Sequence, residues 1–303
     1  MATIKEPMKW LIVGGSGQLG RAMQAELCNS EIECISLDRG QLDITNRSEI
    51  RRIFGIEKPN IVLNAAAWTN VDEAEVAEKR ASLVNSFGAG LVAQECSLVG
   101  SRLIHISTDF VFSGASEFPW KEESKLEPIS AYGRTKAEGE RQVRKFLPDN
   151  FLIVRTAWLY SPWGKNFAKT MLQLALQETR IVEVVADQKG QPTSALDLAT
   201  QIHAMIDHNV APGVYHGTNS GLASWFEFAQ YIFELSGADP ARVIPVGSSQ
   251  YPQRASRPAF SALGHQHWFD QGLAPMRSWR EAINEVLPEI ISALNLREEP
   301  HGN

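Results

Sequence analysis

A glycine-rich run near the start of the chain, Gly14 to Gly20, constrains the possible folds more than any other stretch. An apolar segment typical of a strand, Lys9 to Val13, leads directly into it, and an amphipathic helical pattern follows it. In this setting Gly14 permits a tight turn, Gly17 lets the backbone approach a pyrophosphate, and Gly20 lets helix and strand pack closely. The free N–H groups of the helix start attract phosphates. The run therefore predicts a dinucleotide-binding unit rather than a merely structural turn.

Short apolar runs rich in branched residues recur along the chain, at Glu33–Leu37, Asn60–Asn64, Leu103–Ile106 and Asn150–Arg155. Such runs, separated by helical patterns, are typical of buried parallel strands. We therefore predict an α/β fold, a doubly wound parallel (Rossmann-type) sheet with a smaller C-terminal substrate lobe.

The chain is long enough to hold two units, and we expect them to be interleaved. Residues 1–160 would form the NAD(P)-binding Rossmann domain, to which the chain would return around residues 181–215. The remainder of residues 161–303 would form the substrate-binding lobe. Ser194 and Ser224 are predicted to cap helices in this part of the chain.

The composition excludes several classes of protein. With 29 basic and 35 acidic residues, the formal charge is -6, which argues against a general nucleic-acid-binding surface. No apolar run approaches the roughly 18 residues that a membrane helix needs, and Met1 to Met8 lacks the apolar core of a signal peptide. We therefore expect a cytoplasmic protein that binds neither nucleic acid nor membrane.

The cysteines and histidines favour neither a disulfide framework nor a metal site. Cys28, Cys34 and Cys96 are odd in number and have no Cys-x-x-Cys spacing. His265 and His267 are close together, but the sequence places no third ligand beside them. Any metal site is unknown at this stage.

The third apolar run ends in hydroxyl and carboxyl groups, Ser107-Thr108-Asp109, at the edge where parallel sheets bind ligands. Tyr132 and Lys136 follow, four residues apart, so on a helix both side chains reach one ligand. This combination suits carbonyl reduction. Tyr132 would protonate the alkoxide, Lys136 would lower the pKa of the phenol, and Thr108 would polarise the carbonyl oxygen.

The Tyr-x-x-x-Lys spacing alone is weak evidence, because a surface helix often carries both residue types. The helical pattern itself is clear only over Thr135–Gln142. The interpretation as an active site depends on the agreement between this spacing, the strand end and the glycine run.

The sequence does not decide between NADH and NADPH. Asp38 follows the second strand and could accept the ribose hydroxyls of NADH, whereas Arg39 could pair with the extra phosphate of NADPH. Asp43 is a plausible partner for the adenine amino group, although an ordinary turn aspartate is nearly as plausible. Small residues at Ala65–Ala67 would let a flat dinucleotide lie against the backbone, and Asn85 lies where the next helix passes the cofactor.

Longer motifs run through nearly the whole chain. The Gln-x-Gly-x-Pro-Thr run of Gln188–Thr193 and the acidic pattern after Thr69 are the most specific. In combination the motifs resemble those of the extended short-chain dehydrogenase/reductase superfamily, and within it the dTDP-4-dehydrorhamnose reductases. The motifs that carry the resemblance are Gly14 to Gly20, Asn64 to Glu75, Ser107 to Phe112, Tyr132 to Lys136, Arg155 to Trp158, Asp187 to Thr193 and Arg257-Pro258.

The resemblance implies hydride transfer from NADPH or NADH to the C4 carbonyl of dTDP-4-dehydro-6-deoxy-L-mannose, which yields dTDP-L-rhamnose. It implies a catalytic triad of Thr108, Tyr132 and Lys136, in which Lys136 also holds the nicotinamide ribose. The substrate-binding residues would be Val71, Thr108, Asp109, Trp158, Asn166 and Arg257. The full cofactor-binding set is Gly14, Gly17, Gln18, Leu19, Gly20, Asp38, Arg39, Asp43, Ile44, Ala66, Ala67, Trp68, Thr69, Asn85, Ser107, Tyr132 and Lys136.

Two residues depart from the family pattern. Phe110 stands where a tyrosine is commoner, and Trp68 stands where a smaller or polar ring is usual. The resemblance also implies a possible Mg²⁺ bound by glutamates and a possible homodimer. Two other functions remain open: reduction of a different nucleotide-linked 4-keto sugar, and a non-catalytic NADP-binding regulatory subunit like the β-subunit of methionine adenosyltransferase.

Overall fold

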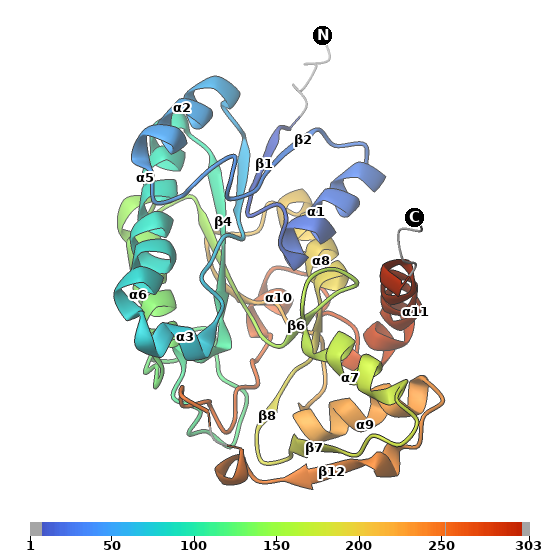
Figure 1. Ribbon diagram of the computed structural model, residues 1–303. Helices are drawn as coiled ribbons and strands as arrows, with labels where there is room; N and C mark the ends of the chain where they lie inside the picture. Colours follow the sequence, from blue (N-terminus) through green and yellow to red (C-terminus); the bar gives the residue numbers. More distant parts are fainter. Residues whose placement is uncertain (1–7, 252, 299–303) are drawn as a thin grey trace.

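Six parallel strands form the central sheet, in the spatial order β10-β5-β4-β3-β1-β2 (Figure 1). The computed structural model describes residues 8–251 and 253–298. The strand order reverses between β1 and β3, which is the switch point where such sheets bind ligands. The predicted doubly wound parallel sheet is confirmed. The strands are β1 (Trp10–Val13), β2 (Cys34–Leu37), β3 (Ile61–Asn64), β4 (Arg102–Thr108), β5 (Phe151–Thr156) and β10 (Gly213–His216).

Helices cover both faces of the sheet, because apolar strands buried on both sides need two layers of cover. On one face lie α1 (Gln18–Asn29) and α8 (Ala195–Asp207), which pack against each other. On the other lie α2 (Arg47–Glu57), α5 (Ala89–Val99) and α6 (Ala131–Phe146). Figure 1 shows the two layers on either side of the strands.

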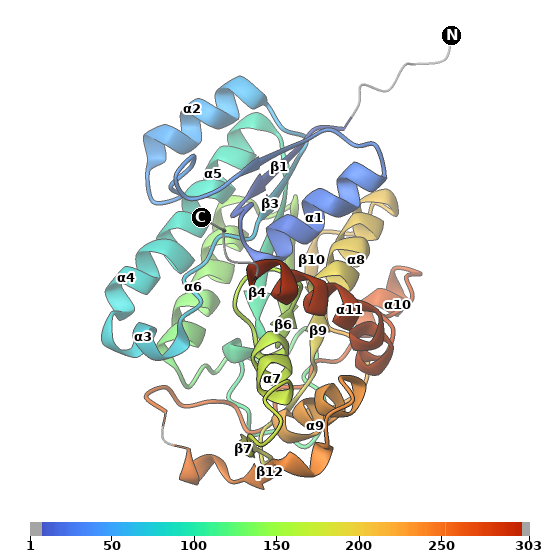
Figure 2. The ribbon, with the colours of Figure 1, turned by 45° about the vertical axis from the view of Figure 1, so that its right-hand side comes forward.

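A smaller group of elements lies below the carboxyl ends of the strands and has its own apolar core (Figure 2). There β7 (Val182–Val185) pairs with β12 (Val243–Val246), outside the central sheet. The chain meets the central sheet again at α8 and β10. The helices of this group are α7 (Phe167–Ala175), α9 (Trp225–Leu235) and α11 (Trp279–Glu298).

Short elements connect these layers. They are α3 (Val71–Val76), α4 (Glu78–Ser82), a π-helical segment (Leu83–Gly88), β6 (Leu159–Tyr160), β8 (Lys189–Gly190), β9 (Thr193–Ser194), β11 (Ala223–Ser224), α10 (Gln266–Asp270) and 3₁₀ turns at Asp109–Val111, Pro240–Arg242 and Ser248–Gln250. No helix of the described residues is long and apolar enough to cross a membrane. The segment before Met8, on which the expectation about a signal peptide rests, lies outside the described residues.

Side-chain caps set the beginnings of several helices. Ser194 accepts a hydrogen bond from the Asp197 N–H, and Ser224 forms a reciprocal capping box, so both predicted caps are confirmed. Helix α6 extends beyond Thr135–Gln142, the stretch in which the helical pattern is clear, and begins at Ala131. Ser130 is the reason, because its hydroxyl accepts the Gly133 N–H at 3.1 Å and satisfies the first turn. Tyr132 therefore lies on the helix itself.

A buried ion pair joins α6 to the sheet. Both nitrogens Nε and Nη2 of Arg155 on β5 donate to the Glu140 carboxylate on α6, at 2.9 and 2.8 Å. The two side chains are 1% and 0% exposed. Ser107, on β4, donates its hydroxyl to the same carboxylate at 2.6 Å. The buried charges of Arg155 and Glu140 are thus paired with each other, and the network holds α6 at a fixed position on β4 and β5.

We predict that Glu140→Gln lowers the free energy of unfolding by about 3–5 kcal/mol, because it leaves the Arg155 cation buried without its counter-charge. Urea denaturation of the two proteins measures the difference. Glu127→Gln is the control, since Glu127 pairs with Lys125 where both side chains are largely exposed, and it should leave the stability nearly unchanged. A loss below about 1 kcal/mol for Glu140→Gln would contradict the role given to this pair.

Candidate active site

The glycine run lies at the switch point and approaches the end of β3 very closely. Gly14 has a φ of +87°, and a Cβ there would come within 2.7 Å of the Ala66 backbone nitrogen. A Cβ on Gly20 would come within 2.4 Å of the Gly14 carbonyl oxygen. Only glycine fits either position. Gly17 directly precedes α1, so the first turn of that helix lies at the end of the glycine run.

Beside the glycine run is an open cavity of about 380 Å³. Asp38 lines it and accepts hydrogen bonds from the N–H groups of Gly40 and Gln41, at 2.8 and 3.2 Å. Arg39 is exposed and is not part of the lining, whereas Arg21, on the first turn of α1, is. Arg21, rather than the predicted Arg39, is therefore the cation that lines this cavity beside Asp38.

Two residues of the predicted cofactor-binding set form hydrogen bonds that hold nearby backbone segments. The buried Asn85 accepts from the Trp68 N–H at 2.8 Å and donates to the Trp68 carbonyl at 3.1 Å. It thereby fixes the backbone between Ala65 and Asn70. Asp43 accepts from both the N–H and the hydroxyl of Thr45, which is the turn geometry that the sequence left as an alternative.

The predicted catalytic residues meet where β4 ends. Tyr132 and Lys136 extend from α6 toward β4, and the hydroxyls of Tyr132 and Thr108 form a hydrogen bond. Lys136 is 2% exposed, and its ammonium group donates to the carbonyl of Ile106. The three side chains are thus brought together as the spacing predicts.

Burial dominates the protonation of this site. It raises the pKa of Tyr132 to about 12, against the lowering effect of the Thr108 hydrogen bond, and the Asp109 charge raises it further. Burial lowers the pKa of Lys136 to about 8, against the opposing effect of Glu140. The expectation that Lys136 lowers the pKa of the phenol is not met, because burial raises that pKa and Lys136 is not among the groups that shift it.

Asp109 adds an acceptor to the site. Its carboxylate is 2% exposed and accepts the Thr108 hydroxyl at 2.9 Å. The Ser261 side chain also interacts with this carboxylate and lowers its pKa, and among the described residues no group lies in hydrogen-bonding geometry with the second oxygen, Oδ2. Burial raises the pKa of Asp109 to about 6. An unpaired buried oxygen next to the two hydroxyls is suited to accept a hydrogen bond from a ligand.

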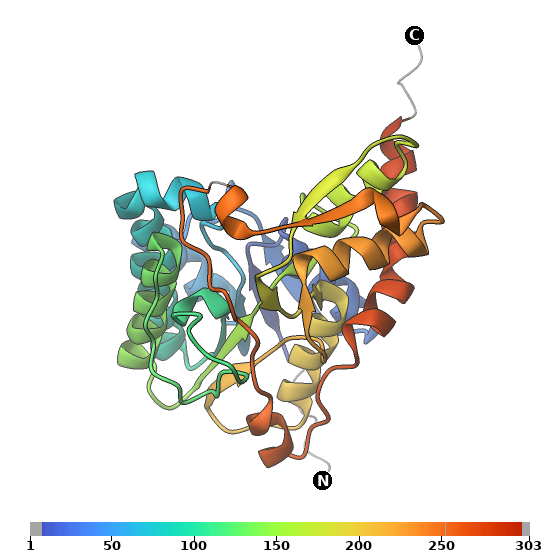
Figure 3. The ribbon, with the colours of Figure 1, turned by 90° about the horizontal axis from the view of Figure 1, so that it is seen from below.

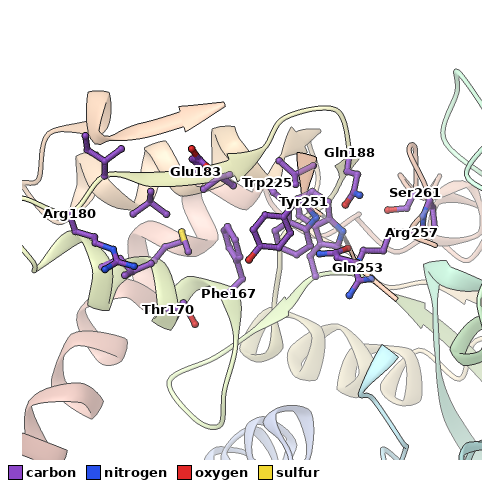
Figure 4. Close-up of a pocket in the computed structure, with 18 of the residues that line it drawn as sticks. Phe167, Thr170, Arg180, Glu183, Gln188, Trp225, Tyr251, Gln253, Arg257 and Ser261 are labelled. Atoms are coloured by element: carbon purple, nitrogen blue, oxygen red, sulfur yellow. The ribbon is translucent and has the colours of Figure 1, made fainter. Parts of the chain in front are cut away.

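A larger cavity of about 820 Å³ opens next to these residues, between the central sheet and the smaller group of elements. Its walls include Phe110, Trp158, Phe167, Trp225 and Arg257. Figure 4 shows the aromatic side chains in its middle, with Arg180 at one end and Arg257 and Ser261 at the other. The walls therefore offer flat apolar surfaces in the centre and cations at the two ends.

Trp158 is held in place at some cost in backbone strain. It has a φ of +46°, stacks on Trp225 with ring centroids 3.5 Å apart, and lies so close to Gly190 that a Cβ there would come within 2.7 Å of its ring. Gly190 belongs to the Gln-x-Gly-x-Pro-Thr motif, so the motif leaves space for this ring. Trp225, which joins the same wall, could not be predicted from the sequence, because its position after Ser224 indicates only the start of a helix.

Arg257 also lines the cavity and is fixed from the opposite side. Its guanidinium forms an ion pair with Asp72 on α3 at 2.8 Å, and this hydrogen bond lowers the pKa of Asp72 to about 2. Of the other predicted substrate residues, Val71 begins α3 and Asn166 caps α7, and neither is part of the cavity wall. The Asn166 amide instead donates to Gln18 on α1 at 2.9 Å.

The family model described as RmlD substrate binding domain matches residues 8–292 of the chain. A dTDP-4-keto-6-deoxy-D-glucose reductase of Streptomyces niveus is 45% identical over 92% of this chain and 96% of its own length. A dTDP-4-dehydrorhamnose reductase of Streptomyces griseus is 42% identical over 93% and 94% of the two chains.

Solved structures agree with these relatives. The dTDP-4-dehydrorhamnose reductase of Bacillus anthracis, solved in complex with NADP, superposes with a TM-score of 0.89 at 38% identity, over 93% of this chain and 99% of that one. The UDP-glucose 4-epimerase of Thermus thermophilus, at 19% identity and a TM-score of 0.81 over 94% and 100% of the chains, shares the fold alone. The chain therefore belongs to the RmlD family, together with its dTDP-4-dehydrorhamnose reductase relatives.

Proposed function

We propose that this chain is an NAD(P)H-dependent reductase that converts dTDP-4-dehydro-6-deoxy-L-mannose to dTDP-L-rhamnose. The observation that carries the proposal is the meeting of Thr108, Tyr132 and Lys136 at the end of β4, next to Phe110, which lines the aromatic cavity. The names of the relatives support the same reaction. The complete triad argues against a non-catalytic binding subunit.

The crevice suits a dinucleotide, because Gly15 and Ser16 of the glycine run line an open cavity of about 380 Å³ together with Asp38, at the switch point of the sheet. When bound there, the reduced nicotinamide supplies the hydride. Lys136 would hold the nicotinamide ribose. We include in the proposal the division into a Rossmann domain of residues 1–160, joined again by the returning chain, and a substrate lobe within residues 161–303.

Tyr132 is the general acid of this proposal. With a pKa of about 12 it keeps its proton at neutral pH and donates it to the alkoxide that forms at C4. Thr108 donates a hydrogen bond to the same oxygen, and Asp109 accepts one from a substrate hydroxyl. Trp158 would contact the sugar, because its ring is a flat apolar wall of the cavity. Arg257 would face the phosphates, because it is a fixed cation.

A second substrate deserves comparison, since a relative at 45% identity is named a dTDP-4-keto-6-deoxy-D-glucose reductase. Oxidation of NADPH and NADH against a panel of dTDP-4-keto sugars distinguishes the two. A cytoplasmic location and a homodimer remain predictions from the sequence. The possible Mg²⁺ has no support in the comparisons, and the one group of three potential ligands among the described residues includes a histidine.

Tyr132→Phe is expected to lower kcat by about 10²-fold or more while leaving cofactor affinity within a few-fold, because it removes only the acidic proton. Steady-state kinetics and cofactor titration measure the two effects. Tyr231→Phe, far along α9, is the matched control and should keep full turnover. Near-normal turnover of Tyr132→Phe would remove this residue from the role of acid.

Asp38→Ala is expected to weaken NADH binding more than NADPH binding, because the carboxylate would accept the ribose hydroxyls of NADH. Arg21→Ala should do the reverse, since Arg21 is the cation that lines the cavity beside Asp38. Arg39→Ala is the control and should change neither affinity much. Equal losses of both cofactors in Asp38→Ala would show that Asp38 does not contact the ribose.

Trp158→Ala is expected to raise the substrate KM by roughly tenfold or more with a smaller change in kcat, because it removes an aromatic wall of the proposed substrate site and leaves the catalytic triad in place. Phe118→Ala, at a side chain that is 75% exposed, serves as control. An unchanged KM would assign Trp158 a purely structural role.

A further inference from the structure

Two segments far apart in the sequence come together at the edge of the central sheet. The loop between β4 and α6 pairs its backbone with the segment that precedes α10, since the Trp120 N–H donates to the Ala262 carbonyl at 2.8 Å and the Gly264 N–H donates to the Trp120 carbonyl at 2.7 Å. Figure 3 shows the green loop meeting the red segment. This pairing brings Glu122 and Glu123 next to His267.

His267 is oriented as metal-binding histidines are. Its Nδ1 lies 2.7 Å from the Val214 carbonyl oxygen, which can only accept, so Nδ1 carries the hydrogen. The other ring nitrogen, Nε2, faces carboxylates and lies 2.5 Å from Oε1 of Glu123. One ligand atom from each of Glu122, Glu123 and His267 lies within 4.8 Å of the others. These three atoms are close enough to bind one ion.

Glu122 supplies an independent sign that a ligand is expected here. The side chain is only 3% exposed, and its Oε1 atom accepts a hydrogen bond from the His267 N–H at 3.3 Å. Within residues 8–251 and 253–298, the buried oxygen Oε2 has no hydrogen-bond partner. A buried carboxylate oxygen without a partner is unfavourable, and a bound cation removes the deficit.

We propose that Glu122, Glu123 and His267 bind one divalent transition-metal ion, for which Zn²⁺ is the best fit. One imidazole nitrogen and two carboxylate oxygens are ligands that Zn²⁺ accepts, and a water molecule would complete a tetrahedral set. Mg²⁺ is a poorer fit because it favours oxygen ligands alone. The metal would be structural, because the triad that carries the proposed reaction is formed without these residues.

The site is placed to stabilise the approach to α6. Arg155, which holds Glu140 on that helix, also donates to the backbone carbonyl of Glu122 at 3.0 Å. An ion that joins Glu122 to His267 would therefore fix the loop between β4 and α6 next to the Arg155–Glu140 ion pair. We expect Zn²⁺ to raise the melting temperature of the protein.

The test uses the full chain after treatment with a chelator. Titration calorimetry with ZnCl₂ is expected to show one equivalent bound, and CoCl₂ should give the visible absorption of a tetrahedral N/O site. His267→Gln should weaken Zn²⁺ binding by at least about tenfold, as should Glu123→Gln, an exposed position where folding is not at risk. His208→Gln, at the exposed histidine that ends α8, is the matched control and should bind like the unchanged protein.

Three outcomes would overturn the proposal. The first is no uptake of either metal. The second is unchanged binding in both His267→Gln and Glu123→Gln, which would place the ion elsewhere. The third is a melting temperature that falls in these variants to the same extent with and without metal, which would show that the cluster is an ion pair only.

Discussion

The arrangement of the site depends on how α6 is fixed against β4. Tyr132, Lys136 and Glu140 lie one turn apart along a single stripe of the helix, and each makes a polar contact with the last three residues of β4. Lys136 donates to the Ile106 carbonyl, Glu140 accepts from Ser107, and Tyr132 is hydrogen-bonded to Thr108. A helix held at three successive turns has little freedom to slide. The relative position of phenol, ammonium and hydroxyl is therefore set before any ligand binds.

The same burial that fixes these groups also determines their protonation. Removing water from a phenol and from an ammonium group favours the neutral form of each, which raises the pKa of Tyr132 and lowers that of Lys136. An acid that keeps its proton is what a reductase needs when an alkoxide forms. Glu140 keeps part of the charge on Lys136, while its own charge is matched by Arg155. The Arg155–Glu140 ion pair thus helps to fix the position of α6 and leaves Glu140 able to stabilise the charge of Lys136.

Local patterns in the sequence were sufficient to predict the features that depend on neighbouring residues. The strand periods, the glycine turn and the four-residue spacing of Tyr132 and Lys136 all concern short stretches. Features that depend on distant contacts could not be predicted. Arg257 meets Asp72, which lies 185 residues away, and Trp158 meets Trp225 only after the smaller core has formed. Helix α6 begins at Ala131, ahead of the clear helical pattern of Thr135–Gln142, because Ser130 caps it.

Two ties between distant segments explain why the cofactor crevice and the aromatic cavity keep a defined relation. On one side, Arg257 and the Ala255 N–H both bind the carboxylate of Asp72, which joins the wall of the cavity to α3. On the other, the Oε1 atom of Gln18 accepts from both Asn166 and Ser161, which joins the start of α7 to the helix after the glycine run. Gln18 lies on the first turn of α1, where a dinucleotide phosphate would bind. The loop that Gln18 holds leads directly into Phe167, which lines the aromatic cavity. Because Gln18 binds both Ser161 and Asn166, the helix after the glycine run and the start of α7 keep a fixed position relative to each other.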